Sequence, residues 1–503
     1  MGVSGRVVKT NYFRRRLNGE LDELASKYIG SYVEDKRLID IDIRVDEAHT
    51  LMLYKQGEIK RHETKKILEA LEIAREDRKK GKFEFKPEDI DIHIATERYV
   101  IKYAGLDTGG KLHTGKSRND QVVTDVRIYT REQIINILEL LLDFISSLAE
   151  LSDEYKEDLM PGYTHGQHAQ VTTIGYYLLG YTYGFLRDID RLLNAYKTVN
   201  LSPLGACALA GTSIKIDRKY TAKLLGFDGI IENSMDAVSS RDFIVETLSA
   251  LVLIMTKLSR MAEDLIDFST YEYGFVVLPD KYCDISSVMP QKKNPDVLEM
   301  IRANAGKTNS LLAEVIMSTL RLPTGYFKDL QPTKKSLCEA IDIVKPSIVL
   351  MKGIIENLEY DVDRMKEVIE ENYVTAPDLA EFMVQNKNLS FRESHMLVGE
   401  LVKRAEQQKM NLKELSPKEI REISMNILGK DIRISKKELQ DATNPLLSVE
   451  RRGFAGPSPM AIKRSLKSLK PQIKKRRDNI KKIKNRLKSA EERFQKTKDD
   501  ILS

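Results

Sequence analysis

A serine pair and two lysines precede a strong helix start in the segment from Asp284 to Arg302, DISSVMPQKKNPDVLEMIR. We expect Asn294 to cap the helix and Pro295 to occupy its first position, with an acid following in the first turn. A helix N-terminus carries free backbone N–H groups and a partial positive charge, so together with Lys292 it can bind an anion. The same field would make a serine hydroxyl beside it, such as that of Ser286, more acidic, although the cap alone is equally typical of an ordinary helix start with surface lysines.

A second polar segment, GGKLHTGKSRNDQVVTD, spans residues 109–125. Ser117, Arg118 and Asn119 offer a hydroxyl, a guanidinium fork and an amide within three residues. Such a set of donors suits a substrate that carries carboxylates. We expect these residues to lie in a loop that leads into a helix from residue 121.

A third segment, MPGYTHGQHAQ, spans residues 160–170. It reads as a polar loop between helices, and loops held by a rigid frame often carry functional residues. A lone histidine is more often structural than catalytic. The position of Thr164 and His165 between a Pro-Gly turn and a helix favours exposure to a cleft instead.

The first segment resembles the loop GSS-x-MP-x-K-x-NP of the fumarase/aspartase superfamily over its residues SSVMPQKKNP, with Ile285 where that loop usually has glycine. The second is similar to argininosuccinate lyases in particular, which have HTGRSRNDQ where this chain has HTGKSRNDQ, so that Lys116 keeps a positive charge. The third resembles their GYTHLQRAQ. By that resemblance Thr164 and His165 fall on the family's active-site Thr-His pair.

Weaker matches extend the resemblance over most of the chain. Ser448 to Pro459 resembles the family's C-terminal region, whereas the tail beyond about Lys463 is not covered and the first residues depart from the family's usual LWGGRF. The matches that add site residues are Gly30-Ser31 with Asp35 in the N-terminal substrate loop, His93 in DIHIATER, and Tyr326, Lys328, Gln331 and Lys334 in GYFKDLQPTK.

The resemblance implies cleavage of N-(L-arginino)succinate to arginine and fumarate by base-catalysed β-elimination, the last step of arginine biosynthesis. It implies that Ser286 is the base and that Lys292 stabilises the anion formed. It also implies that His165, held by Thr164, gives a proton or a hydrogen bond to the nitrogen that leaves. It implies no metal and no other cofactor. The substrate-binding residues that it implies are Ser31, Asp35, His93, Ser117, Arg118, Asn119, Asn294, Tyr326, Gln331 and Lys334.

In this family each active site collects segments from three subunits of a homotetramer, so the resemblance also implies shared sites. Two other interpretations stay open. One is a sister lyase of the superfamily, such as adenylosuccinate lyase, aspartase or fumarase. The other is a crystallin-like homologue that is not an enzyme.

Long helical patterns must position these segments. Apolar residues recur at helical spacing over residues 131–151, 173–196, 245–268, 297–320 and 336–359, and Pro346 is expected to kink or offset the last helix. No series of alternating strands is present. We therefore predict an all-α fold of three helical domains around a central bundle of long helices, like that of the fumarase/aspartase superfamily.

A composition shift near residues 365–375 suggests a boundary before a smaller C-terminal region. The predicted division is an N-terminal helical domain (1–114), a central bundle (115–364), a small helical domain (365–462) and a basic amphipathic tail (463–503).

The net charge of +6 is unevenly distributed, because residues 463–503 carry a net +11 and the rest a net −5. The mildly acidic body argues against a nucleic-acid-binding protein, and RNA binding would rest on the tail alone. A helix packed on the body or on a partner subunit is the favoured interpretation of the tail. Its apolar face comprises Leu466, Leu469, Ile473, Ile480, Ile483, Leu487 and Phe494.

Several classes of protein are disfavoured by what the sequence lacks. The longest apolar run, residues 250–255, is far too short to cross a bilayer, and the first residues lack the apolar stretch of a secretory signal. Cys207, Cys283 and Cys338 are scattered and form no metal-binding pattern. We therefore expect a cytoplasmic enzyme without membrane contact.

Overall fold

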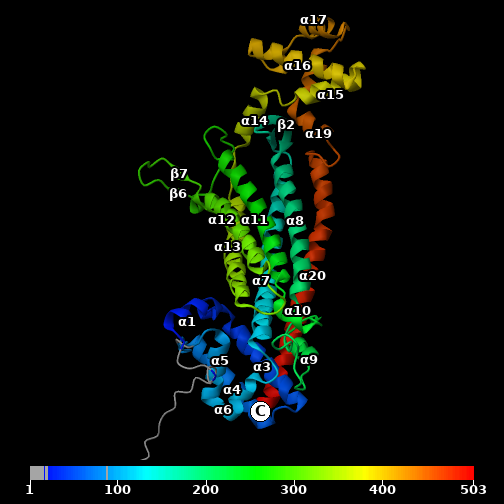
Figure 1. Ribbon diagram of the computed structural model, residues 1–503. Helices are drawn as coiled ribbons and strands as arrows, with labels where there is room; N and C mark the ends of the chain where they lie inside the picture. Colours follow the sequence, from blue (N-terminus) through cyan, green and yellow to red (C-terminus); the bar gives the residue numbers. More distant parts are fainter. Residues whose placement is uncertain (1–15, 17–20, 87–88) are drawn as a thin grey trace, which may run out of the picture.

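The structure, a computed structural model, describes residue 16, residues 21–86 and residues 89–503 (Figure 1). Helices dominate the described chain, which confirms the predicted all-α class. The N-terminal helices gather at the lower end of the molecule in Figure 1. They are α1 (Glu23–Ile29), α2 (Tyr32–Asp35), η2 (Lys36–Leu38), α3 (Ile39–Gln56), α4 (Arg61–Lys79), α5 (Ile92–Ala104), α6 (Leu106–Gly109) and η3 (Gly110–His113).

Five long helices of the described chain form the central bundle, and each overlaps one predicted helical stretch. The longest, α7, has 37 residues and so spans about 55 Å at 1.5 Å per residue. The last, α13, runs on through Pro346. The five are α7 (Arg118–Glu154), α8 (Ile174–Val199), α11 (Asp242–Phe268), α12 (Asp296–Thr319) and α13 (Pro332–Glu356).

The bundle forms because each long helix buries an apolar stripe. On α11, Leu248, Leu251 and Leu258 recur at spacings of three and seven, and all are inaccessible to solvent. Burying such a side chain contributes about 1.5–3 kcal/mol. Between α7 and α8 the rings of Phe144 and Phe185 meet with their centroids 5.2 Å apart.

The stretch around residues 160–172, expected to be a loop, is an antiparallel hairpin of β1 (Leu159–Thr164) and β2 (Gln167–Thr173). That expectation was wrong because the β-branched end of β2 packs into the core, where Val171 is buried. Gly162 lies at a register shift in β1, where an added Cβ would lie 2.7 Å from a backbone oxygen of β2.

The remaining strands are two residues long. The short connecting helices are α9 (Arg218–Leu224), α10 (Ser234–Ser239), η4 (Asp280–Tyr282) and η5 (Lys328–Leu330). The strand pairs are parallel β3 (Leu201–Ser202) with β4 (Gly229–Ile230), antiparallel β5 (Val276–Val277) with β8 (Glu359–Tyr360), and antiparallel β6 (Asp284–Ile285) with β7 (Lys293–Asn294).

The C-terminal helices sit at the upper end in Figure 1 and have an apolar core of their own, from Leu379 to Ala442. The division of the chain into four parts stays a prediction, and its boundaries at 365 and 463 fall inside helices. The helices here are α14 (Val362–Glu371), α15 (Ala376–Lys387), α16 (Phe391–Gln408), η6 (Leu412–Glu414), α17 (Pro417–Leu428), α18 (Lys436–Ala442) and α19 (Pro445–Arg451).

The final helix, α20 (Pro459–Leu502), has 44 residues and spans about 66 Å. It runs back along α7 and α8 and ends against α3 and α4 (Figure 1). Leu469 and Phe494, on its predicted apolar face, are buried. Near its end the Lys498 ammonium lies 2.7 Å from Glu47 and 2.6 Å from Glu72, which anchors the tail to the N-terminal helices. No helix among the described residues is long and apolar enough to span a membrane.

Candidate active site

Ser286 lies just after β6, at the start of the turn that joins β6 to β7. Its backbone N–H donates to the Lys292 carbonyl at 3.1 Å, which closes the turn. Its Oγ accepts hydrogen bonds from the backbone N–H groups of Met289 at 3.0 Å and Val288 at 3.3 Å. Two donors aimed at one hydroxyl oxygen stabilise negative charge on that oxygen.

Ile285, which replaces the family's glycine, pairs with Lys293 in the extended hairpin and is 66% exposed. Its backbone is not in the left-handed region that favours glycine. The hairpin therefore forms without a glycine at this position.

The predicted cap by Asn294 is wrong. Asn294 pairs with Asp284 as the last residue of β7, and α12 begins two residues later, with Pro295 in the cap position and no side-chain cap bond. The two lysines before the helix also differ. Lys293 Nζ lies 2.5 Å from both the Leu278 carbonyl and Asp280, whereas Lys292 is exposed.

Thr164 ends β1, and His165 with Gly166 forms the two-residue turn to β2. Both turn residues have positive φ, 56° at His165 and 69° at Gly166, which is the pattern of a type I′ hairpin turn. A histidine seldom adopts such a backbone conformation, and here the turn holds the exposed imidazole at the hairpin tip.

Ser31, Asp35 and Lys334 form a buried chain of polar contacts. The Ser31 hydroxyl donates to Asp35 Oδ2 at 2.6 Å, and the Lys334 ammonium pairs with the other oxygen of the same carboxylate. Because Lys334 comes from α13, this chain ties the N-terminal loop to the central bundle.

The segment before α13 also holds the N-terminal loop, through hydrogen bonds to its backbone. Gln331 Nε2 donates to the carbonyls of Ile29 at 3.2 Å and Gly30 at 3.3 Å, and Lys328 Nζ reaches the Ile29 carbonyl at 3.2 Å. Burial lowers the pKa of Lys328 and raises the pKa of Tyr326.

A small cavity next to these hydrogen bonds is lined by Tyr326, Gln331, Lys334 and Arg241. Arg241 is buried and donates to the carbonyls of Val238 at 3.2 Å and Ser240 at 2.7 Å, and burial lowers its pKa to about 10. Arg241 was not predicted from the sequence, because it precedes a long apolar helix and matches none of the polar segments.

Residues 117–119 open α7 rather than lie in a loop, because Ser117 forms a capping box with Asp120. The Ser117 Oγ accepts from the Asn119 N–H at 3.3 Å, and the Asn119 amide donates to the Ala208 carbonyl at 3.0 Å. Arg118 stays half exposed, with one nitrogen 3.2 Å from Asp91. Of the three, Arg118 offers the most unused hydrogen-bonding capacity.

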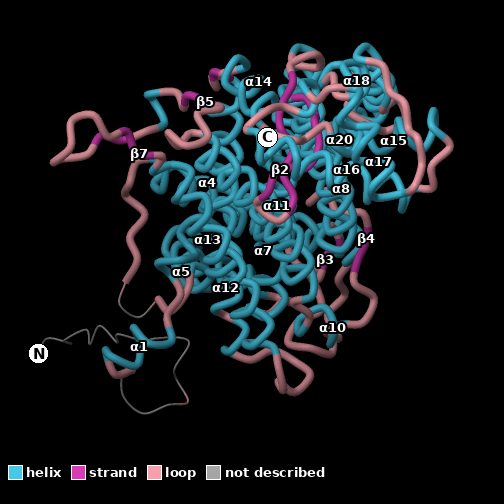
Figure 2. Tube along the Cα trace, turned by 90° about the horizontal axis from the view of Figure 1, so that it is seen from above, coloured by secondary structure: helices cyan, strands magenta, loops and turns pink. Residues whose placement is uncertain are grey.

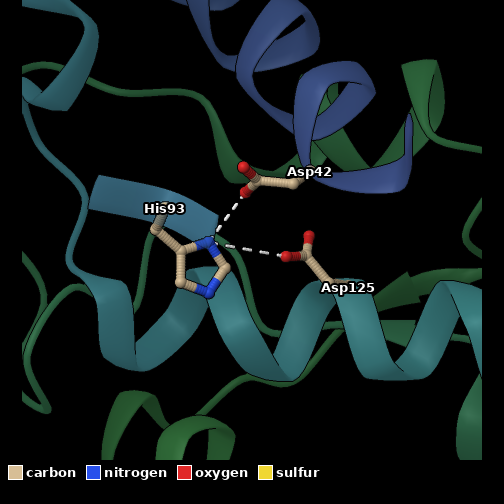
Figure 3. Close-up of side chains that lie close together, drawn as sticks. All are labelled: Asp42, His93 and Asp125. Atoms are coloured by element: carbon tan, nitrogen blue, oxygen red, sulfur yellow. Dashed lines mark hydrogen bonds and ion pairs between the residues drawn. The ribbon is translucent and has the colours of Figure 1, made fainter. Parts of the chain in front are cut away.

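His93 is buried beneath this region, where α3, α5 and α7 meet (Figure 3). Its Nδ1 lies 2.8 Å from Asp42, and since a carboxylate only accepts, Nδ1 carries the proton. Burial alone would lower the pKa of His93, but Asp42 and Asp91 raise it above its usual value.

A buried ionic network, not predicted from the sequence, surrounds His93. Lys116 pairs with Asp46, and Gln121 Nε2 bridges Asp42 at 2.6 Å and Asp46 at 3.0 Å. A signal was present, since Asp42 and Asp46 are four residues apart and so lie on one face of α3. Lys116 therefore serves as a structural counter-ion with a buried side chain.

Asp42, His93 and Asp125 are a candidate cation-binding set, because one ligand atom of each lies within 4.8 Å of the others. Two of the three are already engaged. Asp42 accepts from His93, Gln121 and Thr96, whereas both oxygens of Asp125 lack a hydrogen-bond partner. Asp42 and His93 are thus committed to the ionic network that includes Lys116, and Asp125 contacts this network through His93 Nδ1 at 3.7 Å.

Comparison with known proteins identifies the family. Residues 15–308 match the Lyase family, and residues 373–450 match the family described as "Argininosuccinate lyase C-terminal". The chain is 40% identical over 462 residues to the argininosuccinate lyase of Methanocaldococcus jannaschii, which covers 91% of this chain and 93% of that protein. It is 42% identical over 453 residues to the argininosuccinate lyase of Methanocorpusculum labreanum, covering 90% and 91%.

This chain belongs to the argininosuccinate lyase family.

Solved structures agree with that assignment. The chain is 26% identical in sequence to EDDS lyase, whose structure was solved in complex with formate. The two structures match with a TM-score of 0.85 over 95% of each chain. A class II fumarase from Schistosoma mansoni, 16% identical with a TM-score of 0.68 over 85% of this chain and 92% of that one, shares the fold. The family assignment makes the protein a lyase.

In this member of the argininosuccinate lyase family, the predicted site residues fall into three separate groups. The N-terminal end holds nine of them, the β1–β2 hairpin holds Thr164 and His165, and the β6–β7 hairpin holds Ser286, Lys292 and Asn294. The β6–β7 hairpin projects sideways from the bundle in both views, well away from the other two groups (Figures 1 and 2). The nine are Ser31, Asp35, His93, Ser117, Arg118, Asn119, Tyr326, Gln331 and Lys334.

Proposed function

We propose that this protein splits argininosuccinate into arginine and fumarate. One observation carries the proposal: about nine-tenths of the chain aligns, at about 40% identity, with proteins named argininosuccinate lyase. We also propose that the protein acts in the cytoplasm, as part of arginine biosynthesis.

The base is Ser286. Its Oγ takes the proton from the carbon next to a carboxylate of the succinyl part, and the electron pair left behind becomes the double bond of fumarate as the carbon–nitrogen bond breaks. The two backbone N–H groups that reach Oγ support this role, because they stabilise the oxygen in its deprotonated form.

Lys292 stabilises the charge that builds on the substrate carboxylate when the proton leaves. Its side chain is exposed, and it belongs to the same turn as Ser286. A preorganised positive charge at such a position is often the largest catalytic contribution. Asn294, at the end of the same hairpin, adds an amide donor for the substrate.

His165, held by Thr164, donates a proton to the leaving guanidino nitrogen. Their support is the exposed two-residue turn at the tip of the β1–β2 hairpin.

The N-terminal group binds the rest of the substrate. Arg118, half exposed, suits a carboxylate because a guanidinium can donate two parallel hydrogen bonds. Tyr326, Gln331 and Asn119 contribute neutral donors. Ser31, Asp35 and Lys334 act as a unit, since they are linked to one another.

We further propose that the protein is a homotetramer in which each active site combines the three groups from different chains. Within one chain the groups lie apart (Figure 1). The faces of the long helices also expose large apolar side chains, including Met300 at 57% and Met317 at 68% on α12, which suits burial between subunits.

The experiment is a substrate comparison. Fumarate formation is followed by absorbance with argininosuccinate, adenylosuccinate, aspartate, malate and EDDS offered separately. Turnover of argininosuccinate alone is expected. Turnover of another compound only would assign the protein to a sister lyase, and no turnover of any would favour a crystallin-like protein.

A further inference from the structure

A cavity of about 430 Å³ lies between α20 and the α9–β4 segment, apart from the three groups of site residues. A cavity of this size can hold a small organic molecule. Part of its lining is basic, from Lys219 and Lys223 on α9 and Arg486 and Arg493 on α20. The cavity thus brings together cations from segments that are far apart in the sequence.

The basic side chains exceed the acidic ones. Arg486 pairs with Asp228 at 2.5 Å, and Glu232 is the other acid in the lining. Lys219, Lys223 and Arg493 lie within 4.0 Å of no acidic group among the described residues. With four basic and two acidic side chains, the lining carries a net positive charge.

A buried cation lies beneath the floor. Arg131 is almost inaccessible and donates to the Asn200 side chain and the Leu225 carbonyl, both at 3.0 Å, while its Nε has no partner. Its guanidinium carbon is 5.0 Å from the centre of the Phe227 ring, which lines the cavity. With no acid bonded to it, this guanidinium adds positive potential from below.

The rest of the cavity floor is apolar, and at Gly226 its backbone packs closely against α20. Ala222, Phe227, Ile230 and Ala490 supply the apolar lining. Gly226 has a φ of 75°, and a Cβ there would lie 3.0 Å from Leu487 on α20. A larger residue at position 226 would therefore be strained and would crowd the contact between the floor and α20.

We propose that this cavity binds a small phosphorylated metabolite that also has a flat apolar part, such as a nucleoside diphosphate. Lysine and arginine are the side chains that suit phosphate oxygens, and Lys219, Lys223 and Arg493 form no ion pair with any residue that the structure describes. The apolar floor suits the base.

Isothermal titration calorimetry of the full chain with ADP, pyrophosphate and adenosine tests this. Saturable binding of ADP is expected, with weaker binding of pyrophosphate and none of adenosine. The double variant Lys219→Glu/Arg493→Glu should weaken ADP binding about tenfold or more. Both residues are exposed and form no ion pair, so the variant should fold, as thermal unfolding would verify.

The matched control is Lys467→Glu/Lys481→Glu, which makes the same charge change on the exposed face of α20, away from the cavity. ADP affinity should be unchanged in it. Absence of ADP binding to the unaltered protein, undiminished binding in the cavity variant, or an equal loss in both variants would overturn the proposal.

Discussion

The Asp125 carboxylate lies 3.7 Å from Nδ1 of His93, yet neither of its oxygens has a hydrogen-bond partner (Figure 3). Burial, with the nearby charges of Asp42 and Asp46, raises the pKa of Asp125 well above its usual value. If Asp125 is neutral, two carboxylates balance the charges of His93 and Lys116. The network is then buried without net charge, which avoids a large desolvation cost.

Replacing Asp125 with asparagine should therefore make the protein more stable at high pH. An acid whose pKa is raised by folding stabilises the native state below its unfolded pKa, near 3.8, and that stabilisation is lost as the pH rises through the folded pKa. The free energy of unfolding of the wild type should fall by up to about 1.4 kcal/mol per pH unit in this window from Asp125 alone.

Urea unfolding from pH 5 to pH 9 measures this difference. The two stability profiles should diverge with rising pH. Asp363→Asn, which alters a side chain that is 94% exposed, is the control and should follow the wild type. Parallel profiles for Asp125→Asn and the wild type would show that Asp125 is charged in the folded protein.

Ser286→Ala should abolish fumarate formation while assembly and unfolding temperature stay unchanged, because Ser286 lies in a projecting turn outside the core. Ser287→Ala is the matched comparison and should retain turnover. Loss of turnover in Ser287→Ala alone would move the base to the second serine.

Lys292→Met should lower kcat about 100- to 1,000-fold, the usual effect of losing a preorganised charge at a developing anion. Lys293→Met should cost much less, since Lys293 is directed toward Leu278 and Asp280. Steady-state kinetics of the two variants measures this difference in kcat. Equal kcat values would mean that Lys292 has no special part in the chemistry.

Two inactive variants should restore each other when mixed. If Ser286 and Arg118 reach one site from different chains, hybrids of Ser286→Ala with Arg118→Met regain intact sites, at about a quarter of the wild-type number for random mixing. Activity after denaturation and joint refolding measures this. Hybrids that stay inactive would place both residues in sites made by a single chain.

Lys498→Met should destabilise the protein by about 3–5 kcal/mol, because it removes one partner from a buried ionic group that includes Glu47. Lys481→Met, on the exposed face of the same helix, should change stability by less than about 0.5 kcal/mol. Equal, small changes in urea unfolding would mean that the tail is held by its apolar face alone.

The sequence was most informative where apolar residues repeat at helical spacing. The pattern over residues 245–268 predicts α11 almost to its ends, because an unbroken apolar stripe has few alternatives to a bundle helix. The β1–β2 hairpin was missed, since its strands show no clear alternation of apolar and polar residues and its turn, His165-Gly166, resembles any polar loop. The predicted helix cap at Asn294 is wrong because the pairing of Asn294 with Asp284 extends the β6–β7 hairpin up to α12.

Site residues could be proposed from motifs, but their partners could not. Nothing local reveals that Lys116 is buried against Asp46 rather than directed at substrate, because that pairing joins residues 70 apart in the chain. Arg241 was missed for the same reason, as its place beside Tyr326 depends on the packing of α11 against the segment before α13.

The anchoring of α20 also has a consequence for synthesis on the ribosome. Lys498 is the partner of Glu47 and Glu72, which lie 451 and 426 residues earlier in the sequence on helices that are made before α20. Until α20 has been made and has left the exit tunnel, Arg75 is the counter-charge that the described N-terminal helices offer to Glu47. The N-terminal region should therefore be most exposed to proteases and chaperones before α20 has emerged from the ribosome.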